Sequence, residues 1–164
     1  MSNHIDFNKT RYLELLKKNK TLQNRGIDIF KKNPEEANEL YSYKIMLENQ
    51  IYYNRRDEYI CLINKYLKGK ICFGLFLWEF FSLRRENLQA FDVIEKEILK
   101  QGISRLDTFC IDSKSTEFSN LIQNIEDSSE FATFAPEHPY YLTPDGFRDE
   151  TEETFSKIQI LLKE

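Results

Sequence analysis

Residues 66–102 constrain the fold of this chain most, because their apolar side chains recur at helical spacing over almost the whole stretch. Steps of three and four place such side chains on one face of an α-helix. Gly69 and Gly102 fit the position just past a helix end, where a left-handed backbone costs glycine little. We therefore expect a long central helix with a buried stripe formed by Phe73, Phe76, Leu77, Phe80, Phe81, Leu88, Phe91, Ile94, Ile98 and Leu99.

The most apolar part of this stretch, residues 71–81, is too short for a membrane helix. A bilayer requires roughly 20 apolar residues, and Glu79 interrupts the run. The N-terminus lacks the pattern of a secretory signal. Three widely spaced cysteines, Cys61, Cys72 and Cys110, favour a reducing compartment. We expect no membrane contact and a location in the cytoplasm, or in the plastid stroma if the gene belongs to an organelle.

Turn-forming residues are few, since the 164 residues include only 5 glycines and 4 prolines. This composition disfavours an all-β fold. Asn33-Pro34 and Thr143-Pro144 each have the sequence of a helix start, with a capping side chain followed by proline at the first helical position. We predict an all-α protein: an antiparallel helical bundle with a four-helix core in residues 57–164, and an N-terminal helical extension in residues 1–56.

Several element boundaries stay open in the sequence. A helix is expected over residues 7–32, weakened at Gly26, and residues 54–57 either bend one long helix or separate two. Residues 103–112 fit a short helical turn or an irregular linker. Asp112 or Ser113 is the expected cap of a helix that passes through Phe118 and ends near residues 128–129. Residues 130–142 are predicted to form a long loop.

The tyrosines of the N-terminal half suit a half-buried seam, in which a ring packs and its hydroxyl reaches water. The seam would contain Tyr41, Tyr43, Tyr52, Tyr53, Tyr59 and Tyr66. The lysines and arginines between residues 17 and 32 are read as a solvated face. RNA binding by these basic residues is the alternative.

The sequence contains no nucleotide-binding, hydrolase or metalloprotease motif. Its two histidines, His4 and His138, have no second ligand at metal-binding spacing. Glu79, at the edge of the apolar stripe, is interpreted as a carboxylate that faces water or pairs with a base such as Lys70, rather than as a catalytic acid. We expect no enzymatic activity, no catalytic residue, no metal and no cofactor.

Acidic side chains accumulate towards the C-terminus. The net charge of the whole chain is −4, yet residues 112–164 hold 12 acidic and 4 basic side chains. Such a region attracts a basic protein partner and repels nucleic acid. The candidate partner-binding residues, chosen from charge alone, are Asp127, Glu130, Glu137, Asp145, Asp149, Glu150, Glu152 and Glu153.

The order of features from residue 57 to residue 162 resembles the colicin D immunity protein family and related bacterial and algal-plastid reading frames. The shared pattern is IxxYLKGKIxxxxFxWEF, a long amphipathic helix, an acidic segment, a loop with Phe, Pro and Tyr, and LTPDGFRDETEETF. The positions that match are scaffold residues by type: Leu67, Gly69, Ile71, Phe76, Phe80, Phe147 and Arg148. The resemblance implies a helical bundle that binds a toxin's nuclease domain and presents carboxylates where the toxin expects phosphate.

Two functions follow as expectations. The first is a non-enzymatic immunity-type protein that inhibits a nuclease toxin through its acidic surface. The alternative is a helical adaptor of a bacterium or plastid that has no toxin partner and docks a host protein through tyrosine- and phenylalanine-rich surfaces.

Overall fold

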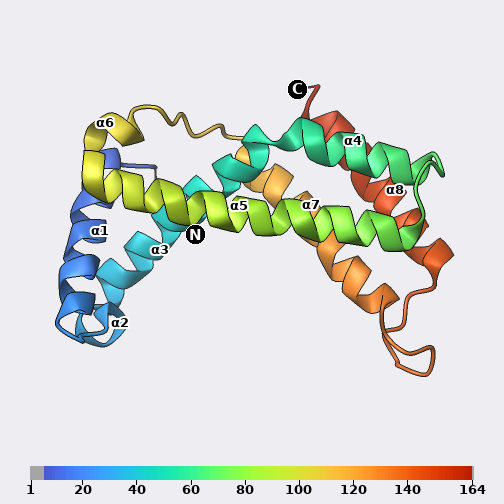
Figure 1. Ribbon diagram of the computed structural model, residues 1–164, viewed down its shortest axis with the longest axis horizontal. Coiled ribbons are helices and arrows are strands. Elements are labelled where there is room, and N and C mark those ends of the chain that lie inside the picture. The colour runs from blue at the N-terminus through green and yellow to red at the C-terminus, as the bar shows by residue number, and fades with distance from the viewer. Residues whose placement is uncertain (1–5, 164) are drawn as a thin grey trace. The chain divides into compact units, whose positions relative to one another are not determined.

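The protein is all-α, as the sequence predicts (Figure 1). The computed structural model describes residues 6–163, and within them it contains eight helices and no strand. The helices are α1 (Lys9–Asn24), α2 (Ile29–Lys32), α3 (Pro34–Asn54), α4 (Arg56–Leu67), α5 (Phe73–Gln101), α6 (Ile103–Leu106), α7 (Ser115–Ala132) and α8 (Pro144–Leu161).

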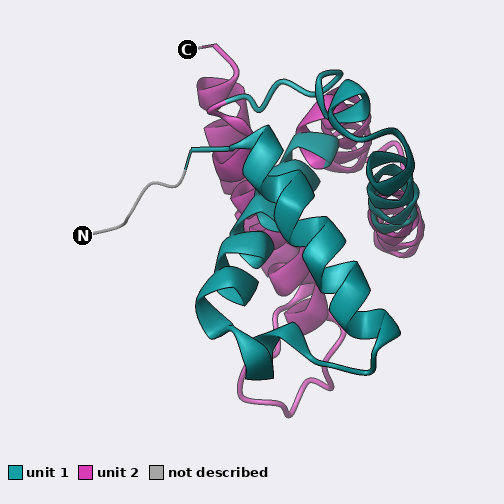
Figure 2. Ribbon diagram, turned by 90° about the vertical axis from the view of Figure 1, so that its left-hand side faces the viewer, with its two compact units in different colours: residues 1–51, 88–112 teal, residues 52–87, 113–164 magenta. Residues whose placement is uncertain are grey.

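The helices form two compact units, each built from two separate parts of the chain (Figure 2). Unit 1 takes its described residues from 1–51 and 88–112, and unit 2 takes them from 52–87 and 113–164. The sequence-based division at residue 56 follows chain order, whereas here residues 88–112 group with the N-terminal segment. Because α3 and α5 each contribute residues to both units, a single cut in chain order does not separate the units.

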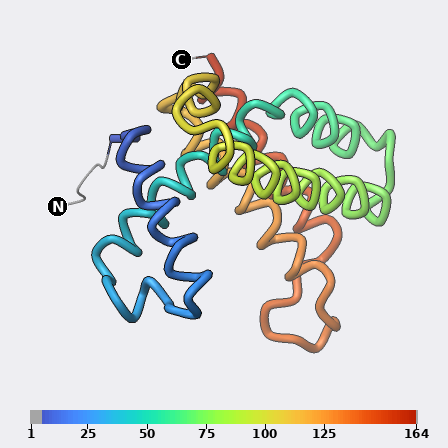
Figure 3. The backbone as a smooth tube through the Cα atoms, turned by 60° about the vertical axis from the view of Figure 1, so that its left-hand side comes forward, coloured from blue at the N-terminus to red at the C-terminus, as the bar shows by residue number. Residues whose placement is uncertain are grey.

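The core of unit 1 follows the helical spacing of its sequence. Leu40, Tyr43 and Leu47 of α3 are buried one turn apart and pack in one cluster with Tyr12 and Ile98. The chain passes from α1 through the short α2 into α3 (Figure 3). The expected single helix over residues 7–32 is wrong, because α1 ends at Asn24 and Gly26 adopts a φ of 69°.

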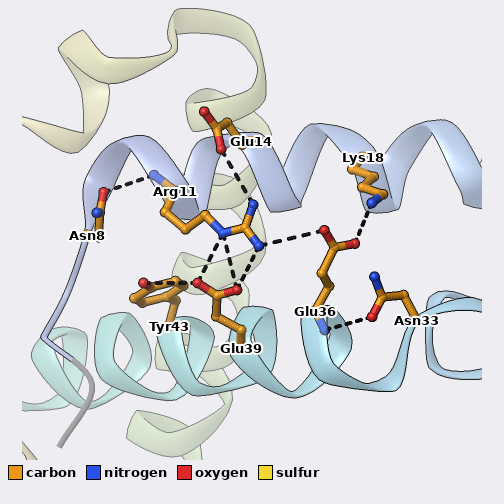
Figure 4. Close-up of polar contacts among 8 residues, drawn as sticks. All are labelled: Asn8, Arg11, Glu14, Lys18, Asn33, Glu36, Glu39 and Tyr43. Carbon is orange, nitrogen blue, oxygen red and sulfur yellow. Dashed lines mark hydrogen bonds and ion pairs between the residues drawn. The ribbon is translucent and has the colours of Figure 1, made fainter.

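A polar network joins α1 to α3 on the surface of unit 1 (Figure 4). The Arg11 guanidinium donates two hydrogen bonds from Nε to the Glu39 carboxylate, at 3.1 and 3.2 Å, and one from Nη2 at 2.9 Å. Lys18 pairs with Glu36. The predicted cap is confirmed, since the Asn33 side chain accepts the backbone N–H of Glu36 at 3.2 Å and Pro34 begins α3.

The core of unit 2 draws on α4, α5, α7 and α8, together with the last turn of α3. Phe76, Phe80, Phe118 and Phe147 have no exposed surface, and the Tyr66 ring stacks on Phe76 with centroids 4.7 Å apart. Within this unit α4 and α5 run in opposite directions (Figure 1), as do α7 and α8. Side chains from α3, α4, α5, α7 and α8 therefore share one aromatic core.

The open boundaries are settled by the structure. Residues 54–57 separate two helices, α3 and α4, and residues 103–106 form the short helix α6. Gly69 and Gly102 have φ values of 67° and 70° just past α4 and α5, which confirms their predicted places. The cap position of α7 is Lys114, one or two residues past the predicted Asp112 or Ser113, and the helix continues to Ala132, beyond the predicted end.

The buried stripe of α5 differs from the prediction at one step. Leu88 is 51 % exposed, whereas Asn87 is fully buried. The buried face proceeds from Phe80 through Leu83 to Asn87, in steps of three and four, so Leu88 falls one position outside it. An amide therefore occupies a core position that the apolar pattern assigned to a neighbour.

The tyrosine seam is more deeply buried than expected. Of the six tyrosines only Tyr41 is exposed, and the other five are at most 8 % exposed. The Tyr59 hydroxyl does not reach water but accepts a hydrogen bond from the Asn87 amide at 2.8 Å. Of the five buried rings, Tyr43 lies in the core of unit 1 and the other four lie in the core of unit 2.

The length and the apolar content of a helix decide whether it can cross a membrane. Between residues 6 and 163 no helix combines the length and the apolar character needed to cross a bilayer.

Candidate partner-binding face on helices α7 and α8

Small buried hydroxyl residues let α7 and α8 pack closely. Ser129 of α7 and Thr151 of α8 are both at most 1 % exposed. Each hydroxyl donates a hydrogen bond to a backbone carbonyl of its own helix: Ser129 to Glu126 at 2.6 Å, and Thr151 to Phe147 at 2.7 Å. The two helices consequently make the most extensive contact of any pair in the described chain.

The first turn of α8 begins as the sequence predicts. The Thr143 side chain accepts the backbone N–H of Gly146 at 3.0 Å, and Pro144 occupies the first helical position. Phe147, Phe155 and Ile158 then face the core of unit 2. This phase leaves Asp149, Glu152 and the neighbouring carboxylates on the solvent side.

A hollow of about 350 Å³ lies between α7 and α8 and gathers three of the predicted carboxylates. Asp127 comes from α7, and Glu150 and Glu153 come from α8. The Ser128 hydroxyl donates to Glu150 across the helix pair. Lys157 lies 2.7 Å from Glu153 and, chiefly through this hydrogen bond, holds the pKa of Glu153 below its ordinary value.

The remaining five predicted residues are exposed but lie outside this hollow. Glu130 is near the end of α7, Glu137 is in the loop, and Asp145, Asp149 and Glu152 are on α8. None of these five forms an ion pair within residues 6–163. The structure thus brings three of the eight carboxylates together and leaves five dispersed over the same two helices and their connecting loop.

Of the eight predicted carboxylates, the cations of α8 pair with only one, Glu153. Arg148 turns away from them: its Nη1 donates to the Tyr66 carbonyl at 3.4 Å and its guanidinium carbon lies 5.6 Å from the Tyr66 ring centre. Lys157 is engaged with Glu153 alone. The face therefore keeps a net negative charge that a basic group from outside can meet.

A half-buried ion pair joins α7 to α5. Glu126 pairs with Arg84 of α5, and Arg84 also donates to Gln123 at 2.9 Å and lies over the Tyr52 ring. Burial raises the pKa of Glu126, and the charge of Arg84 opposes this rise. Glu126 therefore links α7 to α5.

Selection by charge alone missed the uncharged part of the hollow. Asn124 and Ser128 on α7, and Thr154 on α8, line it with the three carboxylates. The signal that finds them is helical spacing, because Asn124, Asp127 and Ser128 lie three and four residues apart on one face.

The arrangement suits reception of a guanidinium or ammonium group. No group of three or more potential ligands has metal-binding geometry in the described part of the chain. Carboxylate oxygens accept charge-assisted hydrogen bonds from Arg and Lys. Comparison of the chain with protein-family models, curated proteins and solved structures finds no match in any of the three.

Proposed function

We propose that this protein is a non-enzymatic binding module of the colicin-immunity type, which inhibits a basic nuclease toxin by docking it on the acidic face of α7 and α8. The observation that carries the proposal is that all eight predicted carboxylates are exposed while the cations of α8 are occupied or turned away. A dense carboxylate surface imitates a phosphate backbone and accelerates association with a basic partner. The kind of partner, a nuclease toxin, is inferred from the sequence resemblance to the colicin D immunity family.

Nucleic acid and membranes are not the proposed partners, because the docking face is anionic. The three cysteines are free and exposed, which agrees with the proposed site of action in a reducing compartment, the cytoplasm or the plastid stroma.

The test uses affinity capture from lysate of the source cells. Wild-type protein is compared with a variant in which Asp149, Glu150, Glu152 and Glu153 are all replaced by lysine. We expect the wild type to retain a basic nuclease and the variant to retain at least about tenfold less of it. A control variant with lysine at Asp6, Glu35, Asp57 and Asp92, which are exposed and outside this face, has the same net charge change and should retain the nuclease normally.

Equal capture by the wild type and the α8 variant would exclude this face as the docking site. Each variant must first show the helical signal and cooperative unfolding of the wild type, so that a loss of binding is not a loss of folding.

An adaptor without a toxin is the second candidate, and it is favoured by the large exposed aromatic side chains. Tyr41, Trp78 and Tyr140 are 58 %, 66 % and 68 % exposed. Recovery of a housekeeping complex instead of a nuclease in the same capture would support the adaptor.

A further inference from the structure

A groove between α4 and α5 of unit 2 is a surface that the proposed function does not use. Its volume is about 590 Å³. Residues 57–65 of α4 and residues 78–86 of α5 line it, and the two helices lie alongside each other in Figures 1 and 3. Eight residues of helix span about 12 Å, or two turns, so the groove is long enough to take two turns of another helix.

The apolar part of the groove centres on the only tryptophan of the chain. Trp78 is 66 % exposed, while Leu62 is buried and Leu83 half-buried beside it. An exposed indole next to apolar side chains is typical of protein interfaces, where tryptophan often supplies the largest share of binding energy.

The charged part of the groove is strongly asymmetric. Four carboxylates, Asp57, Glu58, Glu79 and Glu86, and one ammonium group, Lys65, line it. Arg55 occupies two of these carboxylates, at 2.6 Å from Glu58 and 2.8 Å from Glu86.

The other two carboxylates remain available to a partner. Asp57 and Glu79 form no ion pair among residues 6–163.

We propose that this groove binds a cationic amphipathic helix of another protein. Apolar side chains of that helix, three and four residues apart, pack on Trp78 and the half-buried Leu83, and its flanking lysines or arginines meet Asp57 and Glu79. This is a second docking surface, independent of the α7 and α8 face.

The single tryptophan makes a direct test possible with the full chain. The probe is an amphipathic peptide of about 18 residues built from leucine and lysine at helical spacing. We expect saturable binding that moves the Trp78 emission to shorter wavelength as the peptide covers the indole. A peptide of the same composition in scrambled order, and a leucine–glutamate peptide of the same pattern, should bind at least about tenfold more weakly.

Matched variants separate this groove from general charge attraction. Asp57→Lys with Glu79→Lys should weaken binding of the leucine–lysine peptide by about tenfold or more, whereas Glu35→Lys with Asp92→Lys, exposed positions outside both proposed docking surfaces, should leave it nearly unchanged. Equal binding by both double variants, equal binding of the scrambled peptide, or no emission change would overturn the proposal. So would emission that depends on protein concentration without peptide, because a second copy of the chain would then occupy the groove.

Discussion

At the scale of single residues, Glu36 couples the fold of unit 1 to pH. The hydrogen bond from Lys18 is the main cause that lowers the pKa of Glu36 below 4.5, assisted by the charge of Arg11 and opposed by burial. A carboxyl whose pKa is lower in the folded state stabilises the fold at pH values above its unfolded pKa. That stabilisation is lost as pH falls through the lowered value.

We therefore expect Glu36→Gln to lower the free energy of unfolding at pH 7 and to lower it less at pH 3. Glu35→Gln is the matched control, because Glu35 shares the first turn of α3 but is exposed and has no ion pair within residues 6–163. Urea unfolding of both variants at the two pH values makes the measurement. A Glu36→Gln deficit that is the same at pH 3 and pH 7 would rule out the ion pair as its source.

The residue scale is also where prediction from sequence is least complete. Asn87 is fully buried between Arg55, which donates to its Oδ1 at 3.2 Å, and the Tyr59 hydroxyl. An apolar pattern cannot indicate a buried amide whose partners lie about 30 positions away in the chain. The three carboxylates around the hollow likewise meet only because α7 and α8 fold back on each other.

At the scale of elements, local sequence signals placed most helix ends correctly. Asn33, Thr143, Gly69 and Gly102 act where their backbone and side-chain chemistry predicts. The start of α7 differs from the prediction, since its cap position, Lys114, lies one or two residues past Asp112 and Ser113. Local signals thus place this helix start only to within one or two residues.

Substitution of two glycines near the turn between α4 and α5 tests whether backbone conformation determines these helix ends. The two variants should change the free energy of unfolding in opposite directions. Gly69→Ala should reduce the free energy of unfolding by about 1 kcal/mol, since φ is 67° there and an added Cβ meets no atom within 4 Å. Gly74→Ala, with equally open space but in the first turn of α5, should increase stability by about 0.5 kcal/mol. Urea unfolding of the two variants is the measurement, and changes of the same sign would contradict the backbone explanation.

At the scale of the whole molecule, composition and periodicity were sufficient for the all-α class but not for the interleaved units. Residues 88–112 belong to unit 1 because the second half of α5 supplies Ile98 to that core. Helical period gives the face that a residue occupies, but not which of two cores that face meets. The concentration of charge in residues 112–164 is likewise visible in the sequence, whereas the orientation of Arg148 away from it is not.

The central claim is that the acidic face of α7 and α8 attracts a basic partner by long-range electrostatics. The most direct measurement is the association rate constant of the captured partner with the wild-type protein at low and high ionic strength. The rate should fall by about tenfold or more when salt rises from roughly 50 to 500 mM, because screening shortens the reach of the carboxylates. A rate constant that is the same at both ionic strengths would contradict the claim.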